Sequence, residues 1–187
     1  PQDVLGLEFA GRVIATAPQL DPHRETLWQV GDRVMGICGG GGYVEFISVD
    51  ERTLLPAPSH LTDAECAGLP EVCLTAYDAL TARGHLRAGE RILIHAVGSG
   101  VGLAAARLAH LMGAEVIGTS RAQWKLDRAK SSLPLSEGWL SEEGLFLPTE
   151  ARGSIDVIID FVGGAYLKEN LSALRTGGRL VIVGLLG

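Results

Sequence analysis

The spacing of apolar and polar positions changes character along the chain. Residues 4–55 alternate in short runs that are rich in glycine and β-branched residues. This pattern predicts short strands and tight turns in a small barrel or sandwich. The strand-like runs cover residues 12–15, 32–36 and 43–47.

A helical region is predicted after Pro56 and Pro58, extending to about residue 82. Thr62 is followed three positions later by Glu65, a near match to the capping box that begins many helices. We therefore expect a helix to begin at Thr62.

From residue 91 the pattern becomes strand, glycine-rich turn, helix and strand, the rhythm of a parallel sheet. The run 154–160 is apolar enough to be a strand buried on both faces. Residues 131–152 are interrupted by prolines and glycines and are predicted as loop with at most one short strand. The expected strands are 91–96, 115–119, 154–160 and 179–183, and the expected helices are 102–112, 122–130 and 166–174. The predicted fold class is α/β, a Rossmann doubly wound parallel sheet preceded by part of an all-β domain.

Composition excludes several classes of protein. The chain has 187 residues, 47% of them hydrophobic, which suffices for a buried core. Its net charge of -6 offers no basic field for nucleic acid, and its apolar runs are too short to span a membrane. Three cysteines at no metal-binding spacing, without a secretory signal, favour a reducing cytoplasm. Because the chain begins without Met and ends after an apolar run, we expect a fragment.

A glycine-rich turn, residues 96–103, joins the first predicted strand of the parallel sheet to its first helix. Glycines let the backbone approach a pyrophosphate closely, and the helix amino terminus then favours the negative charge. Turns collect glycine for other reasons, so a plain turn is the alternative. The strand before it and the helix after it favour a dinucleotide site.

The end of the second parallel strand indicates which nucleotide binds. NAD sites usually place a carboxylate there for the ribose 2′-hydroxyl. This chain instead has Thr119, Ser120 and Arg121, with Lys125 one helical turn later. A hydroxyl and two cations suit a 2′-phosphate, so the prediction is NADPH. The alternative is that both cations are solvated surface charges.

Several motifs occur in one order across nearly the whole chain: residues 6–11, 31–34, 42–46, 74–77, the glycine-rich turn and 184–187. In these the chain resembles the medium-chain dehydrogenase/reductase superfamily, and within it the zinc-free quinone oxidoreductase branch. The resemblance implies that residues 1–58 are part of a GroES-like substrate domain and residues 59–187 a Rossmann domain with an incomplete carboxyl-terminal end. It also implies an active site in the cleft between the domains.

The resemblance also implies a reaction without zinc. Zinc alcohol dehydrogenases of the superfamily carry a ligand histidine where this chain has Leu7, and they often carry four closely spaced cysteines that this chain lacks. We expect hydride transfer from NADPH to a small-molecule acceptor, a quinone or a conjugated carbonyl. The alternatives are an enoyl reductase acting on an acyl thioester and a non-catalytic NADPH-binding protein or fragment. Members of the family commonly form homodimers.

The resemblance assigns a set of residues to the cofactor and no residue to catalysis. Arg121 and Lys125 would bind the 2′-phosphate, Phe161 would lie on the adenosine side, and residues 184–187 would approach the nicotinamide. For Tyr77 the alternative is core packing, and His95 is expected to be a hydrogen-bonded core histidine. The set comprises Thr75, Tyr77, Ser99, Gly100, Val101, Gly102, Leu103, Ser120, Arg121, Lys125, Phe161, Gly184 and Leu185.

Overall fold

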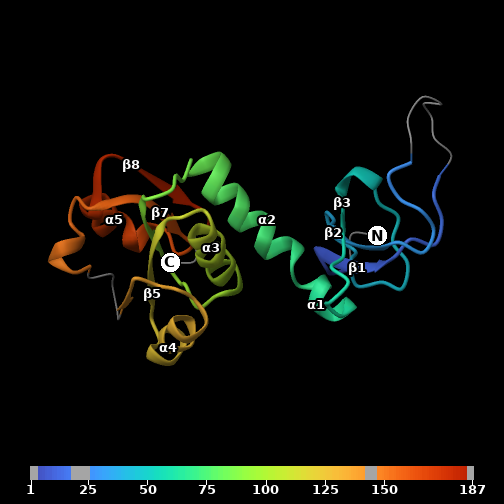
Figure 1. The fold of residues 1–187 in the computed structure, drawn as a ribbon, viewed down its shortest axis with the longest axis horizontal. Coiled ribbons are helices and arrows are strands. Elements are labelled where there is room, and N and C mark those ends of the chain that lie inside the picture. Colours follow the sequence, from blue (N-terminus) through green and yellow to red (C-terminus); the bar gives the residue numbers. More distant parts are fainter. Residues whose placement is uncertain (1–3, 18–25, 142–146, 185–187) are drawn as a thin grey trace. The chain divides into compact units, whose positions relative to one another are not determined.

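A computed structural model describes residues 4–17, 26–141 and 147–184 of the chain (Figure 1). It divides into two compact units, Pro1–Val72 and Cys73–Gly187. The division falls inside helix α2 (Pro70–Asp78), whereas the sequence pattern places a domain boundary after residue 58. That boundary stays a prediction.

The first unit contains a three-stranded antiparallel sheet in the order β1-β2-β3. Its strands are β1 (Glu8–Arg12), β2 (Arg33–Ile37) and β3 (Leu54–Pro56), the last preceded by the 3-10 turn Glu51–Thr53. Phe9 and Val34 are the buried apolar residues of this sheet. The expected short strands and tight turns of a partial all-β domain are therefore present.

Two strand predictions in the first unit are wrong. Residues 43–47 form no strand, and the strand expected at 12–15 lies earlier, at Glu8–Arg12. The Tyr43 amide donates to the carbonyl of Leu5, a residue distant in the sequence and outside any strand, at 2.9 Å. The side chains of Tyr43 and Phe46 are 76% and 72% exposed. Alternation marks a strand only where a neighbouring backbone pairs with it, and no described strand pairs with residues 43–47.

Helix α1 (Asp63–Ala67) begins with the predicted capping box. Thr62 Oγ1 accepts from the Glu65 amide at 3.2 Å, and Glu65 Oε2 accepts from the Thr62 amide at 2.8 Å. Arg33 of β2 donates to the Leu61 carbonyl at 2.9 Å and pairs with Asp63, which fixes α1 against the sheet. The expected helical region continues through α2 into a π-helical turn, Ala79–Arg83.

The second unit is built on a five-stranded parallel sheet in the order β6-β5-β4-β7-β8 (Figure 1). Its strands are β4 (Arg91–Ile94), β5 (Glu115–Ser120), β6 (Glu137–Leu140), β7 (Ile155–Asp160) and β8 (Leu174–Ile182). This is the predicted Rossmann sheet. β8 begins earlier than the predicted residue 179, and β6 is the one short strand that the prediction allowed within 131–152.

Helices and turns cover both faces of this sheet. Ile92, Ile94 and Ile159 pack with Ala105 and Ala109 of α3 (Gly100–Leu111) and with α4 (Gln123–Ser132). On the other face Leu93, Ile117 and Ile158 pack with Ala173 of α5 (Leu167–Ala173) and with the 3-10 turn Thr149–Ala151. Every residue of β7 is buried, which confirms the prediction of a strand covered on both sides.

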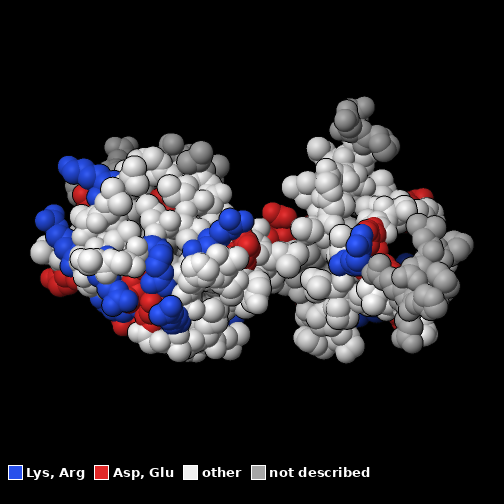
Figure 2. Space-filling model, turned by 90° about the horizontal axis from the view of Figure 1, so that it is seen from above, with Lys and Arg blue, Asp and Glu red and all other residues white. Residues whose placement is uncertain are grey.

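Ion pairs join the amino-terminal ends of the parallel strands. Arg179 of β8 binds both carboxylate oxygens of Glu90, at 2.9 and 2.7 Å. Arg91 pairs with Glu115 and Glu137, both at 3.2 Å. Figure 2 shows acidic side chains intermixed with Lys and Arg on the second unit. These pairs lie at the edge opposite the glycine-rich turn, so they stabilise the sheet without entering the candidate site. In the part of the chain that is described, no helix has the length and apolarity to cross a membrane.

Candidate functional site

The candidate site lies at the carboxyl edge of the five-stranded sheet. Strand β4 is the first of the sheet, with β5 on one side and β7 on the other, so the strand order reverses at β4. Open parallel sheets bind ligands at such a switch point, outside the carboxyl ends of the strands. The fold brings to this edge the glycine-rich turn after β4, Ser120 at the end of β5, Phe161 after β7 and Gly184 after β8.

The glycine-rich turn is tightly packed around its glycines. A Cβ on Gly102 would lie 2.5 Å from the Ala96 carbonyl oxygen, and a Cβ on Gly98 would lie 2.9 Å from Lys125 Cβ. Ala96 itself has φ +48°, a conformation that L side chains rarely adopt. The turn is therefore held in one shape in which only glycine fits at two positions.

The backbone amides at the start of α3 lie within the glycine-rich turn. Ser99 caps the helix, because its Oγ accepts from the Gly102 amide at 3.1 Å, while the Leu103 amide donates to the Ser99 carbonyl at 2.8 Å. The Gly100 and Val101 amides have no acceptor within the described residues. Free amides at the start of a long helix are the groups that bind a diphosphate. The residues present thus fit a dinucleotide, with the Ser99 side chain serving the helix.

The β5 end carries the residues predicted for the 2′-phosphate. Ser120 is 5% exposed, and its hydroxyl is used locally, accepting from the Ala122 amide at 3.2 Å. Arg121 and Lys125 are exposed, and neither has a carboxylate partner in the described part of the chain. The ammonium of Lys125 lies 5.4 Å from the centroid of the Trp124 ring. The two cations are thus free to meet an anion, whereas the Ser120 hydroxyl serves the turn.

Two further predicted residues lie at this edge after β7 and β8. The Phe161 ring is 8% exposed and packs in the core, so only its main chain faces the edge. A Cβ on Gly184 would lie 2.7 Å from the Phe161 carbonyl oxygen, which requires glycine there. Leu185, the last predicted cofactor residue, lies outside the described residues.

Thr75 and Tyr77 lie on α2. Tyr77 is 59% exposed, so the alternative that it packs in the core is wrong. Thr75 is half-buried. Their predicted contact with a cofactor stays a prediction.

A buried network of polar groups lies beneath the same edge, and the sequence predicted such a role for His95 alone. His95 has no exposed surface, and its Nδ1 and Nε2 lie 2.9 Å from Thr119 Oγ1 and 2.7 Å from Asn170 Oδ1. Asn170 Nδ2 donates to Asp160 at 2.9 Å. The prediction of a hydrogen-bonded core histidine is confirmed. Asp160 ends an otherwise apolar strand, and this pattern could have indicated a buried, hydrogen-bonded carboxylate.

Asp160 connects this chain of polar groups to the loop after β7. Its Oδ1 accepts from the amides of Val162 and Gly163, at 2.7 and 3.0 Å. Burial lowers the pKa of His95, against the opposing effects of the Asn170 hydrogen bond and the Asp160 charge. The imidazole is therefore neutral and serves as a connector between strands.

Within the described ranges, no group of three or more His, Cys, Asp or Glu side chains is placed to hold a metal ion. Cys38 and Cys66 are not joined in a disulfide.

Two family models match the chain, one in each unit. The alcohol dehydrogenase GroES-like domain matches residues 1–59, and the zinc-binding dehydrogenase domain matches residues 100–187.

Curated relatives match over nearly the full chain. The spectinabilin polyketide synthase system protein NorB of Streptomyces orinoci is 39% identical over 98% of this chain, which spans 8% of that protein. The phenolphthiocerol synthesis polyketide synthase Pks15/1 of Mycobacterium bovis is 37% identical over 96% of this chain, again 8% of that protein. The chain thus spans a small part of these relatives.

Solved structures share the fold over about half of their own length. The CurK enoyl reductase is 29% identical, with a TM-score of 0.81, over 98% of this chain and 55% of that chain. Mycobacterial Rv1454c, solved with NADPH, is 26% identical, with a TM-score of 0.81, over 97% and 57%. The quinone oxidoreductase of Coxiella burnetii is 28% identical, with a TM-score of 0.77, over 94% and 54%.

The fold, the glycine-rich turn and these matches are those of the dehydrogenase and reductase class of folds. The chain belongs to the medium-chain dehydrogenase/reductase superfamily, with a GroES-like region followed by a Rossmann domain.

Proposed function

We propose that this chain is the nucleotide-binding part of an NADPH-dependent reductase that works without a metal and reduces the conjugated double bond of an enoyl thioester. The observation that carries the cofactor assignment is the pair Arg121 and Lys125. Both are exposed after β5 and lack a carboxylate partner among the described residues, at the place where NAD-binding proteins usually present a carboxylate. The Rv1454c structure with NADPH supports the same choice.

The relatives favour the enoyl thioester as substrate. The two polyketide synthases are 37% and 39% identical to this chain, more than any of the three solved structures above. The CurK enoyl reductase, at 29% identity, supports the same substrate class. The second candidate is a quinone, the acceptor first expected from the sequence, which the Coxiella burnetii enzyme supports at 28% identity.

The residues of this chain bind and orient the nucleotide. The Gly100 and Val101 amides bind the diphosphate, the Arg121 and Lys125 side chains bind the 2′-phosphate, and Gly184 allows close approach near the nicotinamide. When bound, the nicotinamide supplies the hydride. The protein contributes orientation and excludes water, which is how a reaction without covalent or metal assistance is accelerated.

The cofactor assignment is tested by titrating the chain with NADPH and, separately, with NADH, following nicotinamide fluorescence. We expect tighter binding of NADPH and loss of this preference in the double variant Arg121→Ala/Lys125→Ala. Arg128→Ala, a charge removed from the exposed face of the same helix, is the matched control and should keep the preference. Equal binding of both nucleotides by the unaltered chain would overturn the assignment.

The substrate is tested by NADPH oxidation in the full protein that contains this chain. A crotonyl thioester of N-acetylcysteamine and a soluble benzoquinone are supplied in separate reactions. Turnover with the thioester alone supports the proposal, and turnover with the quinone alone supports the second candidate. NADPH binding without turnover of either acceptor contradicts both and supports a non-catalytic binding protein.

The same proposal includes a small-molecule acceptor as partner, a reducing cytoplasm as location and a homodimer as oligomeric state. Cys38 and Cys66 are not joined in a disulfide, which supports a reducing compartment. Sedimentation velocity of the full protein tests the dimer, and a single monomeric species at micromolar concentration would contradict it.

A further inference from the structure

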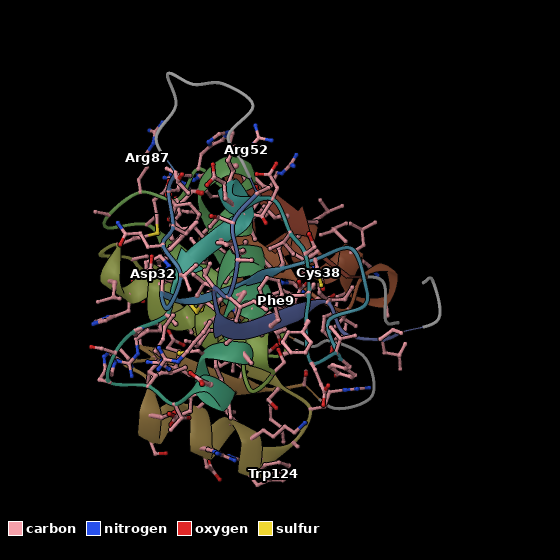
Figure 3. All side chains as sticks on the ribbon, turned by 90° about the vertical axis from the view of Figure 1, so that its right-hand side faces the viewer. Phe9, Asp32, Cys38, Arg52, Arg87 and Trp124 are labelled. Carbon is pink, nitrogen blue, oxygen red and sulfur yellow. The ribbon has the colours of Figure 1, made fainter. Side chains whose placement is uncertain are left out.

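The first turn of α4 holds an exposed indole beside one of the two candidate 2′-phosphate cations. Trp124 is 63% exposed, and Figure 3 shows it on the outer side of α4. The ammonium of Lys125 lies 5.4 Å from the centroid of that ring, within the range of a cation–π interaction. The indole therefore has a contact partner on the surface of the unit.

The other end of the Lys125 side chain is also fixed. At Gly98, in the glycine-rich turn, a Cβ would lie 2.9 Å from Lys125 Cβ and 3.5 Å from Lys125 Cδ. The absence of a side chain at Gly98 lets the stem of Lys125 pack on the turn expected to hold the diphosphate. Lys125 thus lies against the glycine-rich turn at its Cβ and against the Trp124 ring at its ammonium group.

This placement bears on how well a lysine can recognise a phosphate. A lysine ammonium is a flexible point charge whose rotamer freedom is lost when it binds an anion. Restricting that freedom before the ligand arrives strengthens binding, because less entropy remains to be lost. Arg121 has no such ring contact among the described residues, so the effect falls on Lys125.

We propose that Trp124 is a positioning residue that strengthens the preference for a 2′-phosphoadenosine group by holding the Lys125 ammonium over its ring. The inference rests on the proposed NADPH function and extends it to a residue that contacts the phosphate only through Lys125. Trp124 should therefore increase the affinity for the 2′-phosphate and leave the affinity for the rest of the nucleotide unchanged.

Two small ligands separate these contributions. Adenosine 2′,5′-bisphosphate carries the 2′-phosphate, and 5′-AMP lacks it. Calorimetric titration of the whole chain with each should show Trp124→Ala weakening the bisphosphate about two- to fivefold, the effect of an exposed cation–π contact, with no change for 5′-AMP. Trp124→Phe keeps a ring and should recover part of the loss. Leu111→Ala, which removes another exposed apolar side chain from the second unit, should change neither affinity.

A double-variant cycle with Lys125 tests whether the indole acts through the lysine. In a Lys125→Ala background, Trp124→Ala should cause no further loss of bisphosphate affinity. As a readout independent of binding, the ε-proton NMR signals of Lys125 should be shifted upfield by the ring in the unaltered chain and return to ordinary positions in Trp124→Ala.

The outcomes also distinguish this inference from the function on which it rests. If the unaltered chain prefers the bisphosphate but Trp124→Ala does not change that preference, the role of Trp124 is overturned and the NADPH assignment stands. Equal weakening of both ligands would make the indole a platform for adenine and also overturn the inference. If the unaltered chain shows no preference for the bisphosphate, both the assignment and the inference fail.

Discussion

His95 Nε2 lies 2.7 Å from Asn170 Oδ1, and neither side chain has exposed surface. Asp160 can only accept, so the Asn170 amide must donate Nδ2 to it and present Oδ1 to His95. His95 then carries its proton on Nε2, and the Thr119 hydroxyl donates to Nδ1. The hydrogen bonds therefore all point one way, from Thr119 of β5 through His95, which follows β4, and Asn170 of α5 to the carboxylate that ends β7.

Replacing Asn170, which joins His95 to Asp160, should lower the stability of the fold. Asn170→Leu leaves a buried imidazole donor and one oxygen of a buried carboxylate without their partners, and we expect a loss of about 2–4 kcal/mol in the free energy of unfolding. Urea denaturation followed by circular dichroism measures it. Lys168→Ala, an exposed change on the same helix, should stay within about 0.5 kcal/mol of the unaltered chain. A similarly small effect for Asn170→Leu would mean that the network is energetically unimportant.

Burial of His95 predicts a dependence of stability on pH. Its pKa in the fold lies below the ordinary value of 6.5, chiefly because burial disfavours the charged form. The unfolded chain therefore binds a proton first as pH falls, so this contribution to stability is complete above pH 6.5 and declines below it. Denaturation between pH 7.5 and about pH 5 should show a steeper decline for the unaltered chain than for His95→Gln. His110→Gln, at an exposed position, should keep the steep decline; parallel curves for all three would contradict the prediction.

The ion pair between Glu90 and Arg179, at the opposite edge of the sheet, should also make stability depend on pH. Hydrogen bonds from Arg179 hold the pKa of Glu90 below its ordinary value of 4.5, with burial opposing them. The contribution is present above pH 4.5 and is lost as pH falls through the lower pKa of the folded state. Glu90→Gln should reduce the free energy of unfolding at pH 7 by about 1 kcal/mol. The difference between the two chains should shrink as the solution is acidified below pH 4.5; a difference that is constant with pH would argue against the ion pair.

Gly102 should be the least replaceable glycine of the turn. A methyl group there would lie 2.5 Å from the Ala96 carbonyl oxygen, so Gly102→Ala must displace backbone and should cost about 1–3 kcal/mol. NADPH affinity should fall with it, because the turn that presents the Gly100 and Val101 amides is displaced. Gly164→Ala has open space around the added methyl and is the control for both the thermal-melting and the titration measurements. Equal melting temperatures for the two variants would contradict the packing argument.

The local pattern of the sequence was sufficient for most of the second unit and for the capping box at Thr62. These features depend on residues a few positions apart: apolar spacing that selects a helix or a strand, and a hydroxyl three residues before a carboxylate. The glycine-rich turn was found for the same reason, since strand, glycines and helix follow one another directly. The order of the strands then brought the glycine-rich turn, Ser120 and Gly184 to one edge.

The tertiary structure decided what depends on distant partners. Residues 43–47 alternate like a strand, yet no described strand pairs with them. The pattern left Tyr77 open between core and surface, and packing made it an exposed residue. The Ser120 hydroxyl bonds to its own turn, and His95 meets Asn170, 75 positions away. A sequence shows which groups can hydrogen-bond or be buried, but chain topology selects which of them meet, because burial requires each polar group to find its partner in three dimensions.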